Sequence, residues 1–82
     1  MRQIFSNKNI RKSENNMKNN IRKIRREKGL SIGELAQLAN TSKVYIYHLE
    51  NGTRTNPSYE IMRSIAKSLS KEITDVFIFE KM

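Results

Sequence analysis

The chain has 82 residues, which allows one small domain with a modest core and leaves little room for a catalytic cleft. Lys and Arg outnumber Asp and Glu by 16 to 8, and the net charge of +8 predicts a surface that attracts polyanions such as nucleic acid. The absence of cysteine excludes disulfides and thiolate metal sites, and no apolar run approaches the roughly 20 residues of a membrane helix. We therefore expect a soluble cytoplasmic protein without a cofactor or metal.

Residues 1–17 are rich in Asn, Ser and basic residues and contain few apolar ones, which predicts a flexible basic arm. A folded domain is expected at residues 18–79, followed by a short tail at residues 80–82. Two interpretations of the arm remain open: it could be sequence upstream of a start at Met17, or it could wrap around DNA.

A first helix is predicted where apolar residues recur with helical spacing at Met17, Ile21 and Ile24. Basic residues occupy its other faces, and Gly29 is typical of the residue that follows a helix end. We therefore expect this helix to run from about Met17 to the residue before Gly29.

Two further helices are predicted around the segment "ANTS". Ser31 and Glu34 have the spacing of a capping box, which indicates that a second helix begins there. Asn40 is able to adopt a left-handed conformation, and Ser42 is a favourable N-cap for a third helix over residues 43–51. Two short helices joined by such a turn form a helix-turn-helix.

The C-terminal part predicts two more helices. The first runs over about residues 58–69, with Asn56 or Ser58 as the cap and Tyr59 among the residues at core spacing. The second is short and lies within residues 71–77, with Phe77 directed inward. The expected fold is all-α, with five short helices and no sheet.

The third helix has two faces of different chemistry. On a helical wheel, Ile46 and Leu49 form a buried seam. The opposite side carries Val44, Tyr47, His48 and Asn51, with Lys43 at its edge. In a helix-turn-helix this outer face is free to enter the major groove, where lysine can donate to guanine, histidine and tyrosine can donate or accept, and a valine methyl can pack on the thymine methyl. We predict base contacts from Lys43, Val44, Tyr47 and His48.

The alternatives for this helix involve packing or chemistry other than base recognition. Val44 could be an isolated exposed apolar residue, and Tyr45 and Tyr47 could be packing residues, an interpretation we favour for Tyr45. His48 has no second His, no Cys and no suitably spaced carboxylate, so the sequence predicts neither a metal site nor an enzyme. RNA binding is disfavoured because the stripe lacks the stacking aromatics of common RNA modules.

Several short motifs occur in a fixed order between residues 21 and 77. They are "IRKIRREKGLS", "ELA", "TS" at the start of the third helix, "IYHLENG", "NPS", and "IAKSL" followed by "DVF". With these motifs the segment resembles the Cro and phage-repressor type of helix-turn-helix protein, also called the xenobiotic-response-element family. The resemblance implies a compact five-helix domain like that of lambda repressor, acting as a transcriptional regulator, with repression the expected role.

The resemblance also implies roles for individual residues. Positions of the family that contact bases match Lys43, Val44, Tyr47 and His48. Positions that contact phosphates match Ser31 at the start of the second helix, Ser42, Asn51, Thr53, Arg54 and Thr55. The positions of Arg25 and Glu50 form a partly buried ion pair in relatives, which would be costly to break if fully buried.

The expected partners are a pseudo-palindromic DNA operator and a second copy of the chain, because one such domain covers few base pairs. Ile78 and Phe79 are the residues expected to contribute to the homodimer, unless both fold back on the core. The alternative function is an antitoxin-like protein-interaction module with secondary DNA binding. Its partner would contact Ile32, Leu38, Ile78 and Phe79.

Overall fold

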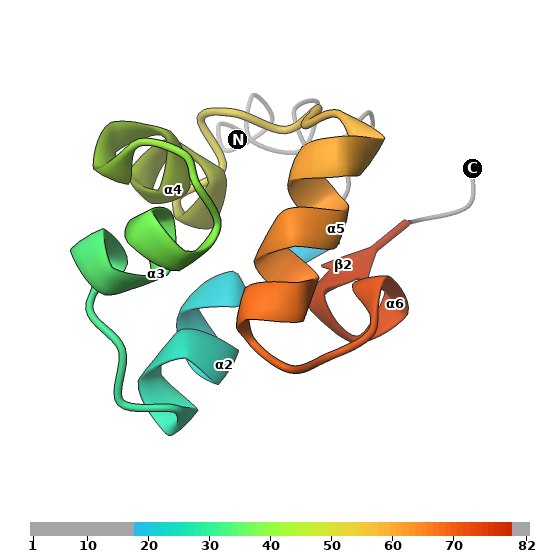
Figure 1. The fold of residues 1–82 in the computed structure, drawn as a ribbon. Helices are drawn as coiled ribbons and strands as arrows, with labels where there is room; N and C mark the ends of the chain where they lie inside the picture. The colour runs from blue at the N-terminus through green and yellow to red at the C-terminus, as the bar shows by residue number, and fades with distance from the viewer. Residues whose placement is uncertain (1–17, 80–82) are drawn as a thin grey trace, which may run out of the picture.

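The computed structural model describes residues 18–79, and within them five helices pack around one core (Figure 1). The predicted arm at 1–17 and tail at 80–82 lie outside the described residues. The elements in chain order are β1 (Lys18–Asn19), α2 (Ile21–Glu27), α3 (Ile32–Leu38), α4 (Lys43–Glu50), α5 (Tyr59–Ser68), α6 (Ile73–Val76) and β2 (Phe77–Ile78). The expected all-α fold is confirmed.

Three helices begin at serine residues whose side chains cap the first turn. The Ser31 hydroxyl accepts a hydrogen bond from the Glu34 amide at 3.0 Å, and the Glu34 carboxylate accepts one from the Ser31 amide at 2.8 Å. The Ser42 and Ser58 hydroxyls cap α4 and α5 by accepting hydrogen bonds from the amides of Tyr45 at 3.0 Å and Ile61 at 3.2 Å. Each cap satisfies an amide that would otherwise have no partner within the helix, so the predicted helix starts are confirmed.

Three helices end with the same backbone motif, in which one residue adopts a left-handed conformation. The φ angles are +73° at Gly29 after α2, +59° at Asn40 after α3 and +59° at Ser70 after α5. In each case the next amide reaches back to a carbonyl in the last turn, as from Thr41 to Ala36 at 2.9 Å. This is the Schellman arrangement, and it turns the chain sharply after each helix.

The prediction that the domain contains no sheet is wrong in one detail. Lys18 pairs with Ile78 and Asn19 with Phe77, so β1 and β2 form a two-stranded antiparallel sheet. The first helix consequently begins at Ile21, later than predicted, and α6 ends before Phe77. The pairing brings the two ends of the described domain together.

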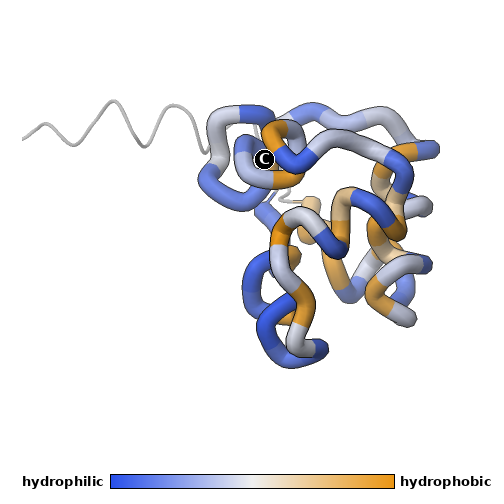
Figure 2. The backbone as a smooth tube through the Cα atoms, turned by 60° about the vertical axis from the view of Figure 1, so that its left-hand side comes forward, coloured by the Kyte–Doolittle hydropathy of each residue, from blue (hydrophilic) through white to orange (hydrophobic). Residues whose placement is uncertain are grey.

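The core receives apolar side chains from all five helices and from β2. Its largest fully buried members are Ile21, Leu35, Ile46, Leu49, Ile65, Leu69, Val76 and Phe77. Figure 2 shows apolar and polar stretches alternating along the tube, as expected for amphipathic helices around one core. Tyr59 was expected in this core, but its side chain is 63% exposed. As the first residue of α5, it points back toward the helix start and beyond the packed residues.

Candidate nucleic-acid interface

The α3 and α4 helices pack against each other and are joined by the short turn formed by residues 39–42 (Figure 1). The side chains of Leu35 on α3 and of Ile46 and Leu49 on α4 are fully buried at this junction and in the core beneath it. Because these apolar residues fix one face of α4, the opposite face is held toward solvent.

The exposed face of α4 carries most of the residues expected to contact bases. Val44 is 61% exposed and Tyr47 is 50% exposed, and Lys43 is also exposed. His48 is half-buried, and so less accessible than the helical wheel predicts. The centre of its ring lies 5.5 Å from that of the Tyr47 ring. Its Nδ1 atom is buried and has no hydrogen-bond partner within residues 18–79. An exposed valine and tyrosine therefore dominate this face, flanked by a lysine.

The loop after α4 folds back onto the end of that helix. The Asn51 side-chain oxygen accepts a hydrogen bond from the Thr53 amide at 2.9 Å, and the Arg54 amide donates to the His48 carbonyl at 3.0 Å. The Arg54 guanidinium lies 5.5 Å from the centre of the Tyr45 ring, a distance suited to a cation–π contact. Tyr45 itself packs against the core, as predicted. The loop therefore holds exposed Arg54 beside the end of α4.

The starts of α3 and α4 lie next to each other. A Cβ atom added at Gly33 would lie 3.5 Å from Cδ of Lys43, so the two helix starts are in contact. Ser31, Lys43, Val44 and Tyr47 line one shallow hollow here. The fold thus places expected phosphate-contacting and base-contacting residues around one surface.

The exposed apolar residues differ in part from the sequence prediction. Ile32 was expected to be exposed, but it is half-buried and packs against the core, where it also borders the hollow beside α4. Leu38 is 59% exposed, as predicted. Ile78 and Phe79 are 42% and 59% exposed, so neither folds back into the core.

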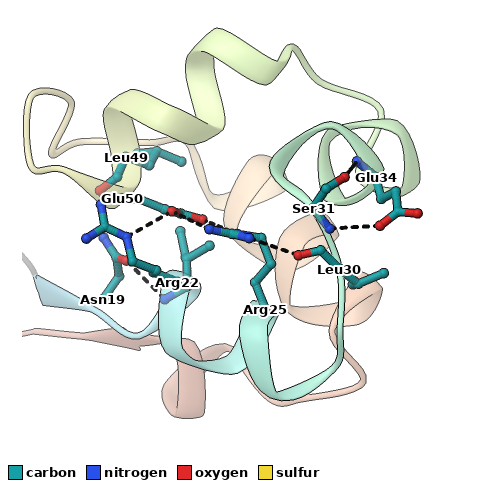
Figure 3. Close-up of polar contacts among 9 residues, drawn as sticks. Asn19, Arg22, Arg25, Leu30, Ser31, Glu34, Leu49 and Glu50 are labelled. Carbon is teal, nitrogen blue, oxygen red and sulfur yellow. Dashed lines mark hydrogen bonds and ion pairs between the residues drawn. The ribbon is translucent and has the colours of Figure 1, made fainter.

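A nearly buried cluster of charges ties α4 to α2 (Figure 3). The Glu50 side chain is 1% exposed and accepts hydrogen bonds from Nε of Arg25 at 2.7 Å and from Nη2 of Arg25 at 3.1 Å. Arg25 is 9% exposed and also donates through Nη1 to the Leu30 carbonyl at 2.8 Å. The hydrogen bond to Glu50 raises the pKa of the Arg25 guanidinium above its usual value. The ion pair expected between these two residues is therefore present.

Two neighbours of this cluster were missed in the sequence. Arg22 lies one turn before Arg25 and donates through Nε to Glu50 at 3.2 Å, with its side chain 47% exposed. The Asn19 side chain in β1 donates to the Leu49 carbonyl at 3.0 Å (Figure 3). The spacing of Arg22 and Arg25 gave a weak signal for a shared partner, whereas no local pattern indicated the contact of Asn19.

The described residues contain no group of three His, Asp or Glu side chains that could hold a metal ion. Within residues 18–79, every helix is too short or too polar to cross a membrane.

Comparison with known proteins gives matches to helix-turn-helix proteins. The sequence model of the helix-turn-helix family matches residues 21–76. The chain is 39% identical over 62 residues to the HTH-type transcriptional regulator SlrR of Bacillus subtilis, a match that covers 76% of this chain and 41% of SlrR. The chain thus spans less than half the length of that relative.

Two solved structures share the fold. The clp gene regulator ClgR from Corynebacterium glutamicum superposes with a TM-score of 0.63 at 31% identity, over 67% of this chain and 57% of that one. The structure of SinR, described as the master regulator for biofilm formation, in complex with DNA gives a TM-score of 0.63 at 34% identity. That match covers 65% of this chain and 84% of the SinR chain. These relatives are described as regulators.

Proposed function

Because this chain belongs to the helix-turn-helix family, we propose that it is a transcriptional regulator that binds double-stranded DNA in a sequence-specific manner and represses transcription. The observation that carries the proposal is the exposed face of α4, where Val44 and Tyr47 lie beside Lys43 while the opposite side of the helix is fixed in the core. The similarity to SlrR and to the DNA-bound SinR structure supports the same function.

In the proposed complex, α4 lies in the major groove with Lys43, Val44 and Tyr47 against the base edges. The lysine ammonium donates to guanine O6 or N7, and the valine methyl groups contact the thymine methyl. His48 contributes at the edge of this contact through the part of its ring that is not buried. Base recognition thus comes from side chains on one helix that Ile46 and Leu49 fix in the core.

The phosphate contacts are proposed to surround this helix. Ser31 and Ser42 lie exposed at the starts of α3 and α4, and the loop carries Asn51, Thr53, Arg54 and Thr55. Positive charge near the DNA backbone, such as that of Arg54, supplies affinity that depends on salt concentration but not on base sequence. These contacts position α4 but do not contribute to sequence specificity. Repression follows if the bound protein occupies DNA that the polymerase must reach.

A second copy of the chain is proposed to bind the adjacent half-site, with half-sites roughly 34 Å apart on one face of the duplex. Ile78 and Phe79 are the proposed dimer contacts, because both are exposed apolar side chains at one end of the domain. Sedimentation of the chain with and without its selected operator tests this assembly. A monomer under both conditions would contradict it.

The function is tested by selecting genomic fragments with the purified chain and locating the site by footprinting. On the selected site, Val44→Ala is expected to weaken binding by about 1 to 3 kcal/mol and to relax the preference at one base pair. Arg54→Ala is the matched comparison, and it should weaken binding to all sequences alike and reduce the salt dependence. If Val44→Ala causes equal losses on selected and random DNA, α4 does not read the groove as proposed.

The alternative of an antitoxin-like module is less well supported by the geometry. Of the four apolar residues expected to meet a protein partner, Ile32 packs against the core instead. The other three do not lie on one element: Leu38 is on α3, whereas Ile78 and Phe79 are at the C-terminal end of the described domain.

A further inference from the structure

A second surface of the domain combines positive charge with exposed apolar groups. A shallow groove runs between α5 and α6, and its lining includes the basic residues Arg63, Lys67 and Lys71, the acidic residues Glu72 and Asp75, and the apolar groups of Tyr59 and Ile73. The α6 side of this groove lies away from α4, with α5 between the two (Figure 1). The groove is therefore separate from the proposed DNA-binding face.

The basic residues of the groove are not used by the fold. Arg63 and Lys67 lie one turn apart on α5, Lys71 follows in the turn after that helix, and all three are exposed. None of them forms an ion pair with any of residues 18–79. Like charges one turn apart destabilise a helix slightly. Lys67 lies in the last turn, where the helix dipole favours a cation, but Arg63 lies in the middle of α5 and gains no such compensation.

Two acidic residues, Glu72 and Asp75, line the α6 side of the groove and offset part of the positive charge of this row. Asp75 accepts a hydrogen bond from the Glu72 amide at 3.0 Å and so caps the start of α6. Neither Glu72 nor Asp75 forms an ion pair with the cations of the groove, and the three basic residues exceed the two acidic ones in the lining. The cations on α5 remain available to an anionic ligand.

Apolar groups distinguish this groove from the basic hollow beside α2. Tyr59 is 63% exposed at one end, and half-buried Ile73 and buried Ala66 contribute to the lining. The hollow beside α2 is also basic, but its lining is polar or charged throughout. A purely phosphate-binding surface gains little from an exposed tyrosine and an isoleucine, whereas a peptide can use both as an apolar anchor.

We propose that the groove between α5 and α6 docks an acidic segment of a partner protein, whose carboxylates pair with Arg63 and Lys67 and whose apolar side chain packs on Tyr59 and Ile73. The exposed cations Arg63 and Lys67, which form no ion pair with residues 18–79, favour an acidic partner over a second copy of this chain, whose own net charge is +8. This proposal concerns a surface other than α4 and does not depend on DNA binding.

The test uses the full chain and a fluorescent synthetic peptide of Glu and Asp with Phe and Leu at its centre. We expect peptide binding to shift the amide resonances of α5 and α6 and to leave those of α4 unchanged. The double variant Arg63→Glu/Lys67→Glu should weaken peptide binding by roughly tenfold or more. Tyr59→Ala should weaken binding of this peptide but not of one in which Phe and Leu are replaced by Ser.

The matched control is Lys23→Glu/Arg26→Glu, which makes the same change in net charge at two exposed residues of α2. If both double variants weaken peptide binding equally, the attraction is a general effect of charge and the proposal is wrong. The proposal is also wrong if the peptide does not bind. If the peptide shifts the amide resonances of α4, it binds the proposed DNA-binding face as a DNA mimic, and the proposal is again wrong. If the α5 variant loses more affinity for duplex DNA than the control does, the groove binds the DNA backbone and the proposal is wrong. If the chain self-associates through the groove, its partner is a second copy and the proposal is also wrong.

Discussion

The charge cluster between α2 and α4 leads to a prediction about stability. Glu50→Ala removes the acceptor for two hydrogen bonds from Arg25 and one from Arg22. It leaves the Arg25 guanidinium, whose side chain is 9% exposed, with only the Leu30 carbonyl as a partner. Breaking a buried ion pair by removing one side costs about 3 to 5 kcal/mol, because the other charge stays buried without compensation. We expect about 3 kcal/mol here, since Arg25 keeps that one partner.

The size of this effect is large for so small a domain. Domains of this length unfold with free energies of roughly 3 to 9 kcal/mol, so Glu50→Ala should remove a third of the stability or more. Arg22→Ala is the control, because its side chain is 47% exposed and such pairs contribute about 0.5 kcal/mol after solvent screening. The comparison separates the buried contact from the exposed one on the same carboxylate.

The assay is urea denaturation followed by far-UV circular dichroism, because urea is uncharged and does not screen the ion pair. Arg25→Met should destabilise the domain about as much as Glu50→Ala, since it leaves the buried Glu50 carboxylate with only the half-exposed Arg22 as a partner. The double variant Arg25→Met/Glu50→Leu should be less destabilised than the two single effects combined. The interpretation of a buried ion pair is wrong if the free energy of unfolding of Glu50→Ala lies within about 1 kcal/mol of the wild-type value. It is also wrong if Arg22→Ala lowers that free energy as much as Glu50→Ala does.

Three other substitutions test the local structure by thermal denaturation and hydrogen exchange. Ser70→Gly should raise the free energy of unfolding by about 1 kcal/mol, because Ser70 has a φ of +59°, which glycine adopts without strain. Gly33→Ala should raise it by about 0.5 kcal/mol, because Gly33 is helical and the added Cβ would make an ordinary contact at 3.5 Å; a loss of stability would contradict this geometry. Asn19→Ala should lower it by about 1 to 2 kcal/mol and speed exchange of the Ile21 amide, which donates to Asn19 at 3.1 Å; unchanged exchange would show that this contact is absent.

The sequence predicted the helix-turn-helix best where the determinants are local. Ser31 and Ser42 cap the helices whose starts they mark, and Asn40 adopts the left-handed conformation that ends α3. Each of these features depends on residues within a few positions of one another, so spacing alone was sufficient. The inward and outward faces of α4 followed from its period for the same reason, with His48 as the partial exception.

The features that were missed depend on contacts between distant parts of the chain. β1 and β2 have only two residues each, which is too short to show an alternating pattern, and they lie at opposite ends of the domain in sequence although they pair in space. The contact of Asn19 with the Leu49 carbonyl likewise requires β1 to be in place, and the partial burial of His48 does not follow from the period of α4. Tyr59 has core spacing, but it lies at the end of α5, where spacing does not determine burial.

The contact that stabilises α4 also determines the charge of its outer face. Glu50 is the single acidic residue of α4, and an anion in the last turn of a helix is disfavoured by the helix dipole. Its pairing with Arg25 and Arg22 offsets that cost and leaves the carboxylate 1% exposed, turned toward α2. The outer face of α4 therefore presents no negative charge to a polyanion. A carboxylate placed on that face by Tyr47→Glu should consequently weaken binding to every duplex, whereas Glu50→Ala, measured below its melting temperature, should change DNA affinity little. A duplex affinity that falls as much in Glu50→Ala as in Tyr47→Glu would show that the ion pair, and not the charge of the face, controls binding.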